Sequence, residues 1–332
     1  MFEIAGLVVL VVALLTLIPG LASVRSGLAR AAGGWVALAA GLEVLSCVSY
    51  VMAFRAAFCA RMTWRMSYRI GMSELGAAAL LPAGGAGGLA FGAWALRRGG
   101  LPVERIARRS VAFFLVTSAV SVAAVVLVAA GVAVGILPGT GRPVLIAGPL
   151  VVALAAVAIV LVGGRLAAGL VPGWSTEDQS KPLRTAARVL DATSDGVNEA
   201  IELLRSGDPQ LLAGAIGYLV FDLAVFWACF RAFGPAPPIG GLLLAYLFGQ
   251  LGGLIPIPGG IGGVDAGLVG ALVLYGTPAA TATVGVIAYR AVLLVIPAAL
   301  GGTAFVSLRR SMRDEDASRI PCADDAPVTV SP

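Results

Sequence analysis

Long apolar stretches separated by short arginine-bearing segments make up nearly the whole chain. Eight stretches can be read, at about Ile4–Ala22, Trp35–Phe58, Met72–Leu96, Val111–Ile136, Val144–Leu170, Leu211–Phe233, Ile239–Tyr275 and Ala279–Leu308. An apolar stretch of about twenty residues is long enough to cross a bilayer as a helix. The pattern predicts an all-α polytopic membrane protein in which residues 1–308 form one helical membrane domain.

Two of these stretches contain prolines and glycines that a helix cannot easily accommodate. The breaks share a Gly-Gly-x-Gly-Gly core, built by Gly84, Gly85, Gly87 and Gly88 in the first stretch and by Gly259, Gly260, Gly262 and Gly263 in the second. Broken backbone is tolerated at membrane depth only where protein or a water-filled cavity covers it. We therefore expect re-entrant hairpins at about 72–96 and 239–275, beside about six full transmembrane helices.

Arginine placement predicts how the hairpins are oriented. One cluster precedes the first hairpin and another follows it: Arg61, Arg65, Arg69, then Arg97, Arg98, Arg105, Arg108 and Arg109. Basic flanks favour the cytoplasmic side, and a re-entrant hairpin keeps both clusters there. Followed along the chain, this places both termini and Val171–Gln210 inside, with 137–143 and 233–238 outside. The two hairpins then enter from opposite sides, as in an inverted repeat.

Two further segments are expected outside the membrane. Residues 183–205 fit an amphipathic helix on the cytoplasmic surface, with Leu183, Leu190 and Val197 on the apolar face and Asp195 and Glu199 on the solvated face. A plain connector without functional role is the alternative. The polar tail at 309–332 is expected to be disordered.

Composition narrows the function. The chain is 59% hydrophobic and 12% charged, with net charge +5, and it has no basic face outside the membrane flanks, so nucleic acid is not an expected partner. Histidine is absent, which removes the commonest general base and metal ligand. Four cysteines without a CxxC spacing predict free, buried thiols, with neither a disulfide nor a metal site. We expect no cofactor and no enzyme activity.

Charged residues inside apolar stretches are the candidates for function, because burying a charge in a membrane is costly. They are Glu43, Asp222, Asp265 and Arg290. Asp265 follows the second glycine break, where it could cap the next half-helix or help to bind a charged group. Arg290 lies mid-stretch and needs either an acidic partner, with Asp265 expected before Asp222 and Glu43, or an anionic ligand. The N–H groups of both glycine breaks could also face an anion.

The second break carries the strongest resemblance to a known family. The run from Pro256 to Leu268, PIPGGIGGVDAGL, resembles the P-x-P-G-G-(I/L)-G-x-x-E-A signature of the lysylphosphatidylglycerol synthase transmembrane region. Tyr289-Arg290 followed by Pro297 is similar to the last-span pattern of that family, and Asp222 with the Arg231–Gly234 run resembles another span. Asp265 stands where the family usually has glutamate. The first break lacks the acid and arginine of the family pattern, which suggests a divergent substrate.

The resemblance implies a lipid-translocating module of the cytoplasmic membrane, acting on a phospholipid or a polyprenyl-linked lipid. Bifunctional members carry a soluble aminoacyl-transferring domain after the membrane domain; this chain ends soon after its last predicted span, so we expect no lipid aminoacylation. A non-transporting scaffold subunit of an envelope-synthesis enzyme is the main alternative. An ion or small-solute transporter is a further one. A second copy of this chain is a further candidate partner, in a homo-oligomer.

Overall fold

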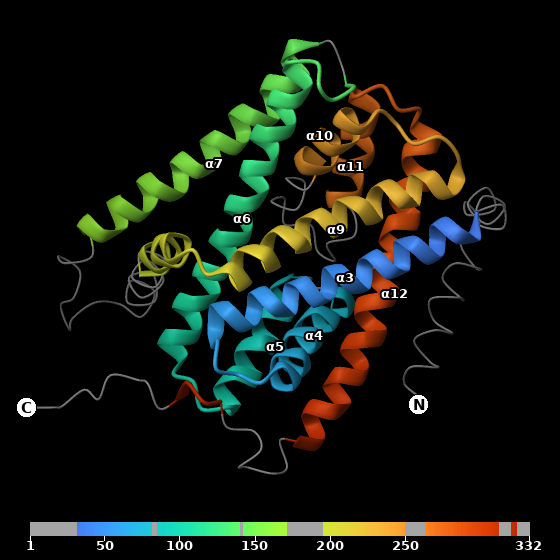
Figure 1. Cartoon of the computed structure of the whole chain (residues 1–332). Helices are drawn as coiled ribbons and strands as arrows, with labels where there is room; N and C mark the ends of the chain where they lie inside the picture. Colours follow the sequence, from blue (N-terminus) through green and yellow to red (C-terminus); the bar gives the residue numbers. More distant parts are fainter. Residues whose placement is uncertain are drawn as a thin grey trace, which may run out of the picture.

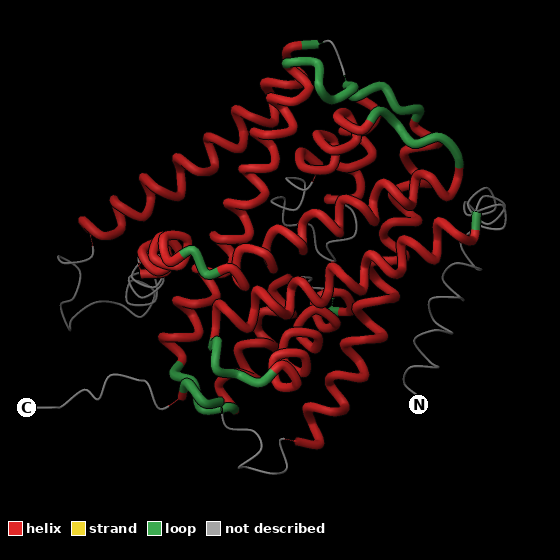
Figure 2. Tube along the Cα trace, viewed as in Figure 1, coloured by secondary structure: helices red, strands yellow, loops and turns green. Residues whose placement is uncertain are grey.

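The computed structural model describes residues 32–81, 85–139, 142–170, 195–249, 263–311 and 320–323, and these ranges contain helices and no strand. The labelled helices are α3 (Gly33–Phe58), α4 (Trp64–Leu80), α5 (Gly85–Arg98), α6 (Val103–Ala133), α7 (Pro143–Leu170), α9 (Pro209–Phe233), α10 (Ile239–Gly249), α11 (Gly263–Leu274) and α12 (Ala279–Ser311). The predicted all-α fold is confirmed (Figures 1 and 2).

Helix lengths agree with a multi-pass membrane protein. In the described part of the chain α3, α6, α9 and α12 are long and apolar enough to cross a bilayer, whereas α10 and α11 are shorter apolar helices. The expected first span at 4–22 lies outside the described residues. The number of full crossings and the re-entrant character of the two broken stretches therefore stay predictions.

All the labelled helices except α7 fall into two units with the same order. α3, α4, α5 and α6 form the first, and α9, α10, α11 and α12 form the second; each unit has a long helix, two short ones and another long one. The turn before the last helix is the same in both. Gly100 and Gly276 have φ of 95° and 90°, and the next N–H, of Leu101 or Thr277, bonds a carbonyl five residues back. We call these units the first and second repeats.

The repeats run in opposite directions. α3 and α9 are antiparallel and touch along their length: the amide N–H of Ala32 donates to the carbonyl of Ala232 (3.0 Å), and Arg55 Nη1 donates to Gln210 Oε1 (2.7 Å). At Gly214 an added Cβ would lie 2.5 Å from the Ala53 nitrogen, so small residues allow this contact. In Figure 1 the α4–α5 pair lies at one end of the molecule and α10–α11 at the other.

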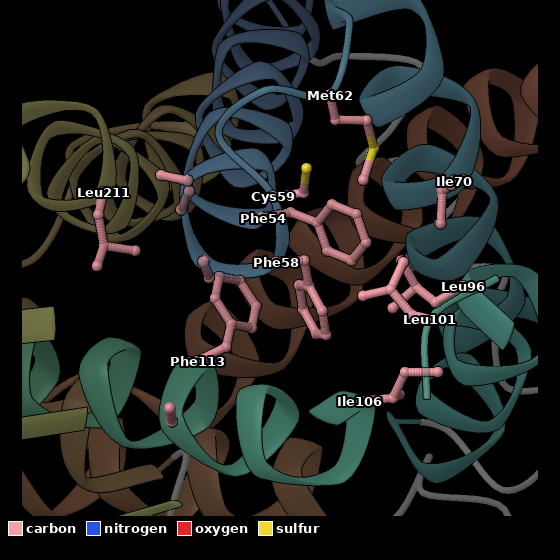
Figure 3. Packing of buried hydrophobic residues seen from close by; sticks show 14 of the residues in the cluster. Phe54, Phe58, Cys59, Met62, Ile70, Leu96, Leu101, Ile106, Phe113 and Leu211 are labelled. Atoms are coloured by element: carbon pink, nitrogen blue, oxygen red, sulfur yellow. The ribbon is translucent and has the colours of Figure 1, made fainter. Parts of the chain in front are cut away.

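Each repeat is built around an apolar core, to which the other repeat adds a few side chains, such as Leu211 in the first core and Ala39 in the second. Aromatic side chains of α3 and α6, including Phe54, Phe58 and Phe113, pack with Leu96 and Leu101 near α5 (Figure 3). The second core gathers side chains from α9 to α12, listed here in part: Phe226, Phe230, Leu242, Leu268, Leu272, Val286 and Tyr289. The repeats meet between these cores, where α3 crosses α9 and where α4 crosses α12 at Gly76 and Gly301.

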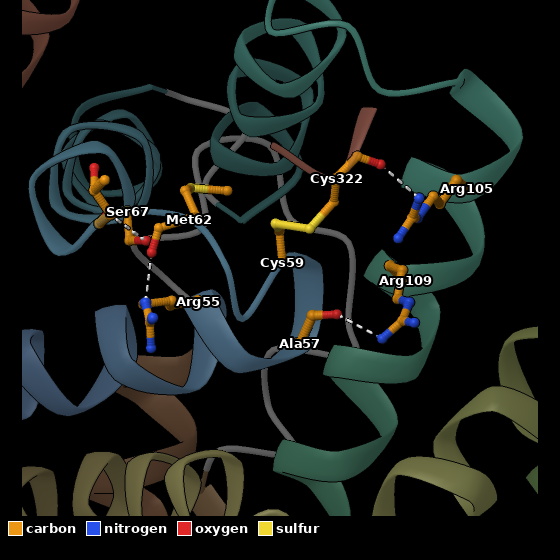
Figure 4. The surroundings of a disulfide bond; sticks show 9 residues. Arg55, Ala57, Cys59, Met62, Ser67, Arg105, Arg109 and Cys322 are labelled. Atoms are coloured by element: carbon orange, nitrogen blue, oxygen red, sulfur yellow. Dashed lines mark hydrogen bonds between the residues drawn. A yellow bond between two sulfur atoms is a disulfide. The ribbon is translucent and has the colours of Figure 1, made fainter. Parts of the chain in front are cut away.

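The cysteine prediction is wrong for one pair. Cys59, just after α3, and Cys322, in the C-terminal tail, form a disulfide with their Cα atoms 6.0 Å apart (Figure 4). Their sequence separation of 263 gave no spacing signal. Cys47 and Cys229 are free and buried, as predicted.

The tail prediction also needs correction. α12 continues to Ser311, past the predicted domain end at 308. Residues 320–323 pack on the turn between α5 and α6: the N–H of Ile320 donates to the Gly99 carbonyl (2.8 Å), Ile320 is fully buried, and Arg105 donates to the Cys322 carbonyl (2.8 Å). These two parts of the tail are ordered, because one continues a helix and the other is bonded to the first repeat.

A surface helix over residues 195–206 agrees in part with the predicted amphipathic helix at 183–205, whose first half lies outside the described residues. Val197 is buried as expected, and Ala200 is buried as well. Glu199 does not face solvent as predicted: it forms ion pairs with Arg108 and with Arg109 (2.6 Å) of α6. The helix is thus fixed to the first repeat by charge as well as by apolar packing.

Candidate functional site

An ion pair joins the two helices that follow the second glycine break. Asp265 lies in the first turn of α11, where a carboxylate interacts favourably with the positive end of the helix dipole. Its Oδ1 accepts a bond from Nε of Arg290, which lies in the first half of α12. The sequence predicted this partner first. The Arg290 and Asp265 side chains are 37% and 24% exposed, so the pair is accessible from outside the protein core.

The terminal nitrogens of the Arg290 guanidinium are not used in the ion pair with Asp265. Only Nε bonds Asp265, and the terminal nitrogens form no further bond within the part of the chain that the structure describes. A guanidinium presents its N–H groups in a planar fork that suits two oxygens of a phosphate or carboxylate. The pair can therefore hold an anion beside the start of α11 while Asp265 keeps the arginine in place.

Asp222, the second predicted partner of Arg290, is instead held by two tyrosines. The hydroxyl of Tyr289, on α12, lies 2.9 and 3.1 Å from the two carboxylate oxygens, and the hydroxyl of Tyr246, on α10, donates to Oδ2. The two hydroxyls are 3.3 Å apart. Asp222 thereby connects α9 with α10 and α12. It also lies near the ion pair, because Tyr289 directly precedes Arg290.

Glu43 lies inside the α3–α9 contact. Ser46 donates to the carbonyl of Tyr218 (3.2 Å) and Arg55 bonds Gln210, so the antiparallel register puts Glu43 opposite Asp222. Glu43 is only 4% exposed. Its Oε1 accepts a weak bond from the Cys47 thiol (3.7 Å), and its Oε2 is buried without a hydrogen-bond partner in the described part of the chain.

Sequence reasoning missed a buried acid in the first repeat. Glu74, on α4, is 5% exposed, and the hydroxyl of Tyr50 donates to its Oε1 (3.0 Å). At Gly92 of α5 an added Cβ would fall 2.1 Å from Glu74 Oε2, so the carboxylate occupies the space that this glycine leaves. Glu74 lies within the predicted stretch Met72–Leu96, so the same cost of buried charge that selected Glu43 could have found it.

The glycine breaks are described only at their edges. Gly84, Gly259, Gly260 and Gly262 lie outside the described residues, while Gly85 begins α5 and Gly263 begins α11. Gly87 and Gly88 pack against the preceding helix: a Cβ on Gly88 would lie 2.7 Å from the Ala78 Cβ. For these two glycines the structure shows close helix packing. Across the described ranges no three histidine, cysteine or acidic side chains come together as a metal site.

Comparison with known proteins agrees with the fold and with the sequence motifs. The family model of the lysylphosphatidylglycerol synthase TM region matches residues 4–301. No curated protein matches the chain, and no solved structure matches it. The match spans both repeats, including Asp222, Asp265 and Arg290. The chain is therefore a multi-pass membrane protein that belongs to the lysylphosphatidylglycerol synthase TM region family.

Proposed function

We propose that this protein moves a lipid with an anionic headgroup across the cytoplasmic membrane, without chemical change to the lipid. The substrate class is a phospholipid or a polyprenyl-linked lipid. Membership of the lysylphosphatidylglycerol synthase TM region family agrees with a role in lipid metabolism or transport. The buried acids with tyrosine partners and the absence of histidine favour a binding and transport role over catalysis.

One observation carries the proposal: Arg290 lies in an apolar helix, is partly exposed, and bonds Asp265 through Nε alone. An arginine that served only to neutralise Asp265 would need no exposed fork, yet its terminal nitrogens are not bonded to the described residues. The start of α11 lies beside it, and the first N–H groups of a helix have no partner within the helix itself. Together these groups would bind the phosphate of a lipid headgroup.

The arrangement of the repeats suggests how the headgroup would cross. Transporters of several folds place the substrate site at broken helices between inverted repeats, and access alternates when one repeat moves against the other. Here α10 and α11 flank the second break, and the first repeat packs against the second through α3 and α4. The lipid chains would stay in the bilayer while the headgroup passes Arg290.

Reconstituted vesicles test the proposal. The purified protein is placed in liposomes that contain fluorescent phosphatidylglycerol, phosphatidylcholine or a polyprenyl phosphate, and the fraction of probe that reaches the other leaflet is measured. We expect faster transfer of the two anionic lipids than of phosphatidylcholine. Equal transfer of all three lipids, or none above that of protein-free vesicles, would contradict the proposal and favour a scaffold role.

Variants at the ion pair separate an anion site from a structural pair. Arg290→Lys keeps the charge but not the planar fork, and we expect it to lose most lipid transfer. The double change Arg290→Met with Asp265→Leu removes both charges, so it should fold, because apolar replacement of an ion pair is often tolerated. We expect it to fold without transporting. Arg310→Met, an exposed position in the last turn of α12, is the matched control and should transport normally; full transport by the double variant would make Arg290 a structural residue.

A further inference from the structure

Glu43 has an arrangement that the proposed headgroup site does not use. It is a carboxylate in the middle of α3, almost completely buried, and its Oε2 has no hydrogen-bond partner among the residues that the structure describes. A buried polar atom without a hydrogen bond costs free energy, and a buried charge without a counter-ion costs more. Binding of a positively charged species at Glu43 would therefore lower the free energy of the folded protein.

Within the described ranges, the groups around Glu43 do not supply that positive charge. From α3 comes the Cys47 thiol, from α9 come Asp222, Tyr218 and Cys229, from α10 Tyr246, and from α12 Tyr289 and Arg290. The ionisable side chains of α6 all lie in its first two turns. Glu74 of α4 bonds Tyr50, which lies two helical turns further along α3 than Glu43. Arg290 is the only cation in this set, and it bonds Asp265.

The carboxylate of Asp222 adds to the free-energy cost of a negative charge on Glu43. The antiparallel register of α3 and α9 puts the two carboxylates opposite each other, and their charges are close enough to interact. Two facing carboxylates in a protein interior cannot easily both be ionised, and such pairs share one proton. Tyr246 and Tyr289 stabilise the negative charge on Asp222 by hydrogen bonds, which leaves Glu43 as the member that holds the proton.

We propose that Glu43 and Asp222 form a proton-binding site that couples lipid movement to a proton gradient. A proton that arrives from the water on one side joins a carboxylate oxygen and cancels one negative charge; when it leaves to the other side, that charge returns. The change is passed on through Tyr289, which bonds Asp222 and directly precedes Arg290. This coupling rests on the proposed lipid transport, but proton binding at Glu43 does not.

The ligand is a proton and not a metal ion. Sodium needs several oxygen ligands, whereas the hydrogen-bond partner that Glu43 Oε1 has is a thiol sulfur at 3.7 Å, a poor ligand for hard cations. The phenols at Asp222 are arranged as donors toward the carboxylate, so their hydrogens point to the place where a cation would have to lie. One proton satisfies both the orphan oxygen and the facing charge.

The first measurement detects the proton without any transport. Infrared spectra of the purified protein across a pH titration report the carbonyl stretch of protonated carboxyl groups. We expect Glu43→Gln to lose one protonated carboxyl that the wild type holds at neutral pH, and Glu104→Gln, an acid in the first turn of α6, to lose none. Asp222→Asn is a second variant; without the facing charge the proton should leave at lower pH. Unchanged spectra in both Glu43→Gln and Asp222→Asn would overturn the proposal.

The second measurement tests the coupling. Vesicles containing fluorescent phosphatidylglycerol are given a gradient of one pH unit, which for one proton per lipid supports about a tenfold ratio of probe between leaflets. We expect that ratio in the wild type and in Glu104→Gln, and no asymmetry in Glu43→Gln. A ratio that follows a sodium gradient instead would overturn the assignment. If no lipid moves in the wild type but Glu43→Gln still loses its protonated carboxyl, the lipid function fails and the proton site stands.

Discussion

The first and second repeats have the same backbone plan but different chemistry. Both contain a glycine at positive φ before the last helix, followed by the same hydrogen bonds. In the first repeat the acid is Glu74, enclosed by Tyr50 and the glycines of α5 and 5% exposed. In the second repeat the acid is Asp265, paired with an arginine and 24% exposed at its side chain. The same arrangement of helices thus holds an enclosed acid in one repeat and an exposed ion pair in the other.

This difference indicates a division of labour between the repeats. Glu74 is closely packed against Tyr50 and Gly92, so under the proposed function the first repeat would be the rigid half against which the other moves. The second repeat has the accessible charges. The two units are joined by the α3–α9 contact, which carries Glu43 on one side and Asp222 on the other, and the proposed proton site would connect the repeats at this place.

The largest expected effect concerns the opposite orientation of the repeats, because the result is all or none. Cysteines placed at Arg98 and Ser206 should react with a membrane-impermeant reagent only from the cytoplasmic side, and one at Pro235 only from outside. The Cys59–Cys322 disulfide lies on the arginine-rich face, and disulfides are rare in the reducing cytoplasm. Labelling of all three positions from the opposite sides would therefore reverse the orientation of the protein in the membrane, but it would leave the two repeats inverted relative to each other. Labelling of Arg98 and Pro235 from one side would break the comparison.

A second effect concerns the contact between α4 and α12. At Gly301 an added Cβ would lie 2.6 Å from the Gly76 Cα, a backbone atom that cannot move aside. We expect Gly301→Ala to lower the free energy of unfolding by about 1–3 kcal/mol, measured by thermal unfolding in detergent.

The next residue gives the control for Gly301. Gly302 has nothing within 4 Å of an added Cβ, so Gly302→Ala should be neutral or slightly stabilising, by about 0.5–1 kcal/mol. In the equivalent contact of the other pair of helices, an added Cβ at Gly240 meets a methyl group of Val132 at 2.5 Å and one backbone atom, the Pro138 carbonyl oxygen, at 2.9 Å. At Gly301 the three nearest atoms all belong to the backbone, at 2.6 to 3.0 Å. Gly240→Ala should therefore cost less than Gly301→Ala. Equal costs would show that the two contacts are alike.

A smaller effect distinguishes the two tyrosine–acid contacts. Tyr50→Phe removes the hydroxyl that donates to Glu74, and a buried acceptor left without a donor costs about 1–3 kcal/mol. Tyr289→Phe leaves Asp222 the bond from Tyr246, so we expect a lower cost, of about 0.5–1.5 kcal/mol. Unfolding in detergent measures both. A larger loss for Tyr289→Phe would mean that the second repeat is the more rigid one.

The smallest effect compares a glycine of α5 with one of α11. Gly92→Ala must displace the Glu74 carboxylate, the mobile end of a side chain, so a cost of about 1 kcal/mol is expected after the gain in helix propensity. Gly270→Ala meets nothing within 4 Å and should not destabilise the protein. Equal stability of the two variants would show that the space around Glu74 is not closed.

Sequence reasoning predicted those features that depend on local pattern or on the cost of charge in a membrane. The apolar stretches, the breaks and the Arg290–Asp265 pair belong to this group, since a charge in an apolar helix is rare and its partners are few. The tyrosines at Asp222 could not be foreseen, because tyrosine is common in packed helices and its hydrogen bond depends on helix rotation. The bonds from Glu199 to Arg108 and Arg109 were missed for the same reason.

Glu74 differs, because it was predictable from its place in an apolar stretch and was overlooked. The Cys59–Cys322 bond was beyond reach, because it joins segments from opposite ends of the domain and nothing in a single sequence shows that they meet. Local periodicity fixes helices, whereas contacts between distant segments depend on the finished packing.

That disulfide also changes the connectivity of the molecule. Cys59 follows the first helix of the first repeat, and Cys322 follows the last helix of the second. The covalent chain between them is therefore a ring that encloses both repeats apart from α3. A single cut between the repeats opens this ring without releasing a fragment, so both halves remain one covalent molecule until the bond is reduced.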